Sequence, residues 1–83
     1  MASTGNRITD ANSVGSPYVV YNSFIEGTEA NIPVTSEGLL ITFRVGITET
    51  GIVSFVQIFR TVENPKTYIR HRFGSNWSSW NEL

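Results

Sequence analysis

The chain closes on TYIRHRFGSNWSSWNEL, residues 67–83, and this stretch decides the fold. Its first seven residues alternate between two sets of side chains, the period of a β-strand with one face toward a core. Gly74 supplies the backbone freedom of a tight reversal, and Asn76 also tolerates the left-handed region. The stretch predicts a strand, a turn and a second short strand, so we expect a folded ribbon that ends a module. The two alternating sets are Tyr68, Arg70 and Arg72 on one side, and Thr67, Ile69, His71 and Phe73 on the other.

Three earlier runs of β-branched and aromatic residues predict strands at residues 17–23, 38–45 and 52–61. Polar, glycine-containing or proline-containing segments separate them, as turns do. Short strands at this spacing are typical of an all-β protein, here a small antiparallel β-sandwich or a sheet of hairpins. The run at 52–61 is apolar on both faces, so we expect it to be central and covered on both sides.

The first part of the chain has no periodic pattern. Residues 1–16 are rich in Ser, Thr, Gly and Asn, which predicts an irregular lead-in. Ile8 is the apolar anchor of this segment, and Asp10 and Asn12 favour a short turn because their side chains bond nearby backbone groups. We therefore expect the β domain to span residues 8–83, with the lead-in at 1–16.

The amino-acid composition excludes several classes of function. The chain has 83 residues, no cysteine and one histidine, so disulfides and multi-histidine metal sites are excluded within one copy. Six basic residues stand against seven acidic ones, which argues against nucleic-acid binding. No apolar run approaches the roughly 18 residues of a membrane span. Because so small a domain buries little surface, we expect self-association to supplement its stability.

Catalysis has no support in the sequence. His71 stands among many serines, but nothing resembles a nucleophile elbow or an orienting acid. The acidic residues fall mostly in predicted loops, and so short a chain leaves little room for the paired carboxylates of a glycosidase. Phosphate-binding glycine loops and metal-ligand spacings are absent. We expect neither an enzyme nor a cofactor.

Several motifs occur in an order that resembles a known module. An Asp-x-Asn at 10–12 and a Pro-Tyr element at 17–21 come first, and Gly-Leu-Leu at 38–40 follows. Val-Gln-Ile-Phe at 56–59, Thr-Tyr-Ile-Arg at 67–70 and Trp-Ser-Ser-Trp-x-Glu-Leu at 77–83 complete the pattern. This order is similar to the knob module of phage and R-type pyocin tail fibres, and the resemblance covers roughly residues 8–83. The Trp-Ser-Ser-Trp ending is its most distinctive part.

The resemblance implies a non-catalytic receptor-binding tip in the tail fibre or baseplate of a virion, acting extracellularly at the host surface. Its partners are then a host cell-envelope polysaccharide of the lipopolysaccharide or teichoic acid type, other fibre or baseplate proteins, and further copies of itself in a homotrimer. One alternative is a structural module that trimerises or caps a fibre without touching a ligand. Another is a small enzyme or lectin-like module unconnected to viruses.

Saccharide recognition combines apolar ring faces with a few placed polar groups. Arginine also binds anionic polymers through charge-assisted hydrogen bonds. An architectural role is the alternative: the two tryptophans have opposite parity, so one of them should pack into the core, and the arginines alternate as solvent-facing strand residues do. The loops at 24–35, 48–50 and 64–66 are further places where binding residues concentrate. The candidate ligand-binding residues are Tyr68, Arg70, Arg72, Asn76, Trp77 and Trp80.

Overall fold

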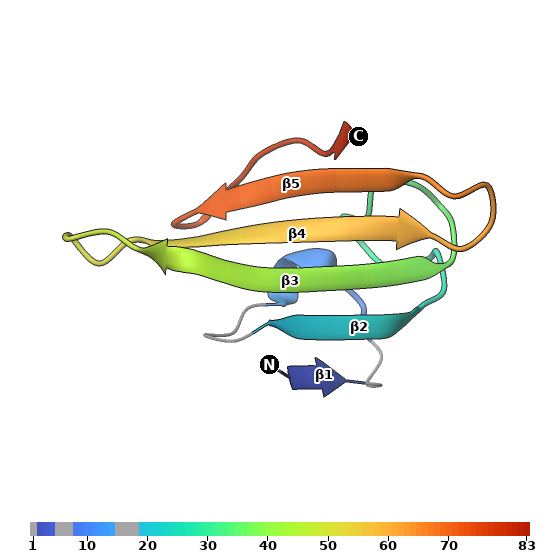
Figure 1. Ribbon diagram of the computed structural model, residues 1–83, viewed down its shortest axis with the longest axis horizontal. Helices are drawn as coiled ribbons and strands as arrows, with labels where there is room; N and C mark the ends of the chain where they lie inside the picture. The colour runs from blue at the N-terminus through green and yellow to red at the C-terminus, as the bar shows by residue number, and fades with distance from the viewer. Residues whose placement is uncertain (1, 5–7, 15–18) are drawn as a thin grey trace.

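The computed structural model describes residues 2–4, 8–14 and 19–83. Within this part, seven strands form one sheet and a single turn of 3₁₀ helix lies against it (Figure 1). The predicted all-β class is confirmed, in the form of a sheet built mainly of antiparallel hairpins. The elements are β1 (Ala2–Thr4), η1 (Ala11–Ser13), β2 (Val20–Ile25), β3 (Gly38–Ile47), β4 (Val53–Thr61), β5 (Thr67–Phe73), β6 (Asn76–Trp77) and β7 (Asn81–Glu82).

The strands β2 to β5 lie side by side in chain order, and each is antiparallel to the next. β4 is central, between β3 and β5, as its apolar sequence predicts. β1 pairs with β2 in parallel. The sequence does not predict β1, because the first residues of the chain show no alternating pattern. The first predicted strand is present as β2, whereas its expected start at Pro17 lies outside the described residues.

The terminal ribbon folds back as the sequence predicts. Phe73 pairs with Asn76 across a two-residue turn, and further on β7 also pairs with β5. Gly74 occupies the first turn position with φ 64°, a conformation that glycine adopts without the penalty a side chain brings. Both β6 and β7 therefore extend the sheet from the same strand.

One face of the sheet is covered by residues 8–14 and by the loop between β2 and β3, and it holds the hydrophobic core. Asp10 caps η1, since its Oδ1 accepts a 2.8 Å hydrogen bond from the backbone N–H of Asn12. This turn was expected, but the segment is not a mere lead-in, because it inserts a fully buried Ala11. The buried apolar residues are Ala11, Val14, Ile25, Leu40, Phe55 and Phe59.

Gly38 begins β3 beside the ring of the buried Phe59. A Cβ there would stand 2.5 Å from the carbonyl oxygen of Arg60 and 2.7 Å from the Phe59 ring. Both distances are below contact range, so any side chain at position 38 would displace the central phenylalanine or the β4 backbone. The glycine of the Gly-Leu-Leu motif is thus explained by packing.

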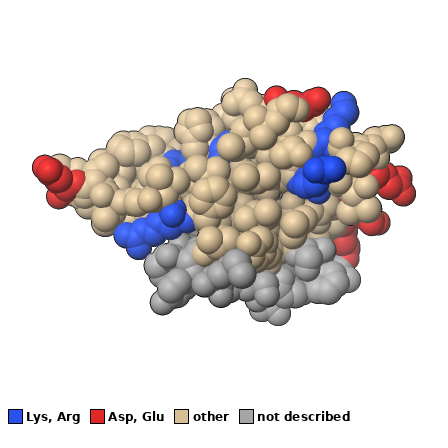
Figure 2. Space-filling view, viewed as in Figure 1, with Lys and Arg blue, Asp and Glu red and all other residues tan. Residues whose placement is uncertain are grey.

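The opposite face, which we call the outer face, carries half-buried apolar residues. Ile41, Ile58 and Ile69 are directly opposite one another on β3, β4 and β5, and Phe43 is opposite Val56. In Figure 1 the 3₁₀ helix lies behind the sheet, and Figure 2 shows mainly uncharged residues over the middle of the near side. Among the described residues no second layer covers this face, so the expectation that β4 is enclosed on both sides is wrong there.

Candidate functional site

Arg70, in the middle of β5, lies between the two indole rings of the terminal ribbon. Its Cζ atom is 3.9 Å from the ring centroid of Trp77 and 4.6 Å from that of Trp80. The residue is 4% exposed. Cation–π contacts at these distances hold a guanidinium in an otherwise apolar setting. The two tryptophans therefore meet on one cation, although their parity on a continuous strand would separate them.

A chain of buried hydrogen bonds links Arg70 to the covering segment. Its Nε donates to Gln57 Oε1 at 2.8 Å. The Nε2 of Gln57 donates in turn to Thr42 Oγ1 at 3.0 Å and to the carbonyl oxygen of Ala11 at 2.8 Å. Buried polar groups are costly unless they are paired. These hydrogen bonds pair polar groups of β3, β4, β5 and η1 with one another. They fix Arg70 rather than leaving it free for a ligand.

The guanidinium of Arg70 stays charged despite its burial. Desolvation lowers the pKa of Arg70 to about 10, and the negative charge of Asp10 partly opposes that shift. The side chain is thus protonated at neutral pH. Its Nη2 has no hydrogen-bond partner within the described part of the chain. A fixed positive charge consequently lies against both indole rings.

Arg72 lies next along the same face and is more accessible. Its Cζ is 5.5 Å from the centroid of Phe55 and 5.6 Å from that of Trp77, and its Nε donates to the carbonyl oxygen of Gly74. Both Arg72 and Trp77 are only half-buried. We call Arg72 and Trp77, with Arg70 beneath them, the arginine–indole cluster.

Trp80 serves the core, as expected for one of the two tryptophans. Its ring meets Phe59 edge-on, with centroids 6.5 Å apart and planes at 66°. Its Nε1 donates to the carbonyl oxygen of Asn31 at 2.9 Å, so it also anchors the loop between β2 and β3. Trp80 therefore acts as an architectural residue of this fold.

The remaining candidate residues are dispersed. Asn76 is opposite Phe73, which puts it on the other face of the sheet from Trp77. Tyr68 packs against the core at the far end of β5. The expectation that Arg70 faces solvent is wrong: the face it shares with Tyr68 and Arg72 is the covered one, and Gln57 and the indoles compensate its burial.

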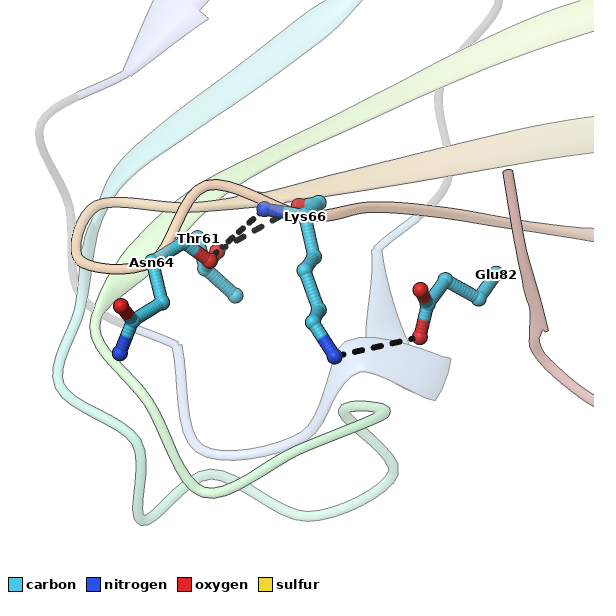
Figure 3. A network of polar contacts seen from close by, with 4 residues as sticks. All are labelled: Thr61, Asn64, Lys66 and Glu82. Atoms are coloured by element: carbon cyan, nitrogen blue, oxygen red, sulfur yellow. Dashed lines mark hydrogen bonds and ion pairs between the residues drawn. The ribbon is translucent and has the colours of Figure 1, made fainter.

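At that far end, two adjoining hollows of about 300 and about 340 Å³ open beside the turn between β4 and β5. Figure 3 shows the polar contacts of this turn, in which Thr61 Oγ1 binds backbone atoms of Asn64 and Lys66. The loops predicted at 24–35 and 64–66 include part of this lining, but the sequence does not indicate that Ser36, Glu37 and Glu63 join them. Pairing of Val62 with Glu37 brings those segments together.

Comparison of the chain with protein-family models, curated proteins and solved structures finds no match. Among residues 2–4, 8–14 and 19–83, no helix has the length and hydrophobicity of a membrane span. The same residues contain no group of three or more His, Asp or Glu side chains placed to bind a metal ion. A functional assignment therefore rests on the chemistry of the surfaces described above.

Proposed function

We propose that this chain is a receptor-binding tip module of a phage or R-type pyocin tail fibre or baseplate. It attaches to the host bacterial surface by binding cell-envelope polysaccharide, and it does so without catalysis. Two things support this: the resemblance of the chain, above all its residues 77–83, to tail-fibre knobs, and the chemistry of the arginine–indole cluster. The module acts extracellularly as part of the virion.

The observation that carries the proposal is a half-exposed indole and guanidinium above a buried cation. Trp77 offers an apolar ring face to the C–H side of a sugar. Arg72 offers a planar set of donors to a phosphate or carboxylate. Arg70 contributes its charge from beneath, 3.9 Å from the Trp77 ring. This combination suits an anionic polysaccharide of the lipopolysaccharide or teichoic acid type.

Self-association in a homotrimer is part of the proposal and is supported by the outer face. Contiguous apolar surface of this kind is unusual on a monomer and marks sites of association. The same observation favours the second candidate function, a structural module that trimerises or caps a fibre while another domain contacts the host. The two functions differ in whether the isolated domain binds an envelope.

Binding to a panel of whole bacteria, purified lipopolysaccharides and teichoic acids separates them. We expect at least one envelope to bind, and Trp77→Ala and Arg72→Gln to weaken that binding about tenfold each, because each removes a stacking or charge-assisted contact. Arg60→Gln is the matched control: it removes the same charge from the outer face. Absence of binding to every envelope, or equal weakening by the control, would contradict the proposed function and favour the structural one.

A further inference from the structure

The two hollows beside the β4–β5 turn adjoin one another, since Thr35, Ser36 and Glu63 line both of them, and we treat the pair as one candidate site. We call this the loop-end groove. Its lining residue Tyr68 is four residues from Arg72 on β5, about 13 Å along the strand, and no residue of the arginine–indole cluster lines either hollow. The groove is therefore separate from the arginine–indole cluster. Each hollow has a volume at the lower end of the roughly 300–1,000 Å³ that ligand pockets occupy.

The lining of the loop-end groove mixes hydroxyl, amide, carboxylate and aromatic groups. One hollow adds Glu26 and Glu37 to the shared residues, and the other adds Val34, Thr61, Asn64, Lys66 and Tyr68. Hydroxyls and amides both donate and accept hydrogen bonds, carboxylates accept from pairs of hydroxyls, and a tyrosine ring packs on apolar ring faces. A small, hydroxyl-rich ring is the ligand that such a set matches.

Backbone pairing holds the walls of the groove in place. The N–H of Val62 donates to the carbonyl oxygen of Glu37 at 3.0 Å, which ties the turn to the opposite wall. Thr61 Oγ1 accepts from the N–H of Lys66 at 2.8 Å, and the backbone N–H of Thr61 donates to the carbonyl oxygen of Lys66 at 3.0 Å (Figure 3). A preformed groove binds a small ligand at a lower entropic cost than one that must order first.

The charge of the groove is opposite to that of the arginine–indole cluster. Glu37 and Glu63 are both exposed at its edge. The Nζ of Lys66, which also lines the groove, lies 3.7 Å from Glu82 Oε1, so the carboxylate of Glu82 partly neutralises its charge. Figure 2 shows acidic groups gathered at the end of the molecule where the β4–β5 turn lies. An anionic sugar would be repelled here, and a cationic one attracted.

We propose that the loop-end groove binds an amino sugar, a hydroxylated ring with a protonated amine. Thr35, Ser36 and Asn64 hydrogen-bond the ring hydroxyls, and Glu37 and Glu63 receive the ammonium group. The inference rests on the proposed function in one respect, that the polymer this chain meets at a host surface contains sugars. It adds a second site, of opposite charge preference, to the arginine–indole cluster.

Titration of the full chain with oligomers of glucosamine and of galactosamine, each as free amine and as N-acetyl form, tests this site. Amide shifts in two-dimensional NMR report both the affinity and the place of binding. At least one free-amine oligomer should shift the amides of Thr35, Ser36 and Asn64. It should bind about tenfold more tightly than its N-acetyl form, because acetylation removes the charge that the carboxylates face.

Glu63→Gln and Glu37→Gln should each weaken the amine form about fivefold to tenfold and leave the N-acetyl form unchanged. Glu49→Gln is the matched control: it removes one carboxylate from the exposed β3–β4 loop, away from the groove. Equal loss in the control would show general charge attraction and overturn the inference. So would failure of every amine form to bind, or shifts confined to the arginine–indole cluster.

These outcomes are separable from those of the proposed function. If envelopes bind and Trp77→Ala weakens that binding while no amino sugar enters the groove, the tip-module proposal stands and the groove inference falls. If amino sugars bind in the groove but no bacterial envelope binds, the groove inference stands and the tip-module proposal falls.

Discussion

On the covered face of the sheet, Gln57 and Arg70 are buried beside Phe59, whereas on the outer face Ile41 and Ile58 remain half exposed. The polar residues are thus inside and a large share of the apolar ones outside. The covering segment explains this arrangement. Residues 8–14 present backbone carbonyls such as that of Ala11, and a carbonyl that leaves water needs a donor from the sheet.

The comparison teaches that the burial of a sheet face depends on what packs against it. A face that meets an irregular segment needs hydrogen-bond donors; Gln57 supplies one to Ala11, and Arg70 in turn donates to Gln57. A face that meets only water, or another apolar surface, needs none. The largely apolar outer face therefore suits an apolar partner, whereas the covered face is already packed within the monomer.

The difference between the two faces is tested most strongly by truncating two adjacent residues of β4, one on each face. Phe59→Ala should lower the free energy of unfolding by roughly 3–5 kcal/mol, because it empties the centre of the core. Ile58→Ala, on the outer face, should cost about 1 kcal/mol in dilute solution, since that side chain is already half exposed. Urea unfolding at low protein concentration measures both values, and equal costs would contradict the assignment of faces.

The buried polar chain provides the next largest effect. Arg70→Met should cost roughly 2–4 kcal/mol, because it removes the cation–π contacts and leaves Gln57 Oε1 without its donor. Gln57→Leu should cost a similar amount. The double variant should cost less than the sum of the two, because the residues act as a pair. Strict additivity in this double-mutant cycle would mean that the two side chains do not interact.

Substitutions on the outer face should change mainly the self-association of the chain. Ile58→Lys puts a charge at the centre of the apolar rows, so we expect a trimer to dissociate while monomer stability changes by less than about 1 kcal/mol. Sedimentation equilibrium at micromolar concentration reports the change. Glu49→Lys, in the exposed β3–β4 loop, is a control for the added charge. A wild type that is monomeric at every concentration would remove the association from the proposal.

The smallest expected effect is the loss of stability at acid pH that comes from Asp10, at the edge of the covered face. The pKa of Asp10 is lowered, first by the hydrogen bond from the Asn31 side chain and then by that from the Asn12 backbone. A carboxylate with a depressed folded-state pKa contributes stability above its unfolded pKa of about 3.9, and loses it as pH falls through the folded value. The difference in unfolding free energy between wild type and Asp10→Asn should therefore shrink below about pH 4. A difference that grows on acidification would contradict the contact.

The sequence predicts the strands well because their alternation and turn residues are local signals. Gly74 marks the terminal reversal, and the β-branched run at 52–61 marks the central strand. Alternation alone does not say which of two faces is inside. For β5 it suggests that Ile69 is buried and Arg70 exposed, yet the partners that reverse this, Gln57 and Ala11, are 13 and 59 residues away along the chain.

The candidate site was predictable to a similar degree. The proximity of Arg72 and Trp77 follows from a hairpin whose turn residues are visible in the sequence. The meeting of Trp77 and Trp80 on one cation was not predictable, because it requires the chain to leave the sheet at residues 78–80. The loop-end groove could not be predicted either, because its two walls are far apart in the sequence and meet only through the hydrogen bond between Val62 and Glu37.

The placement of the two faces can be tested most directly by thiol labelling, since the natural chain has no cysteine. Ile41→Cys and Thr42→Cys place one thiol on each face at adjacent positions of β3. In dilute solution we expect the thiol at position 41 to react readily, and the thiol at position 42 to react only when the chain unfolds. Rapid labelling at position 42 with protection at position 41 would show that the sheet is covered on the opposite side.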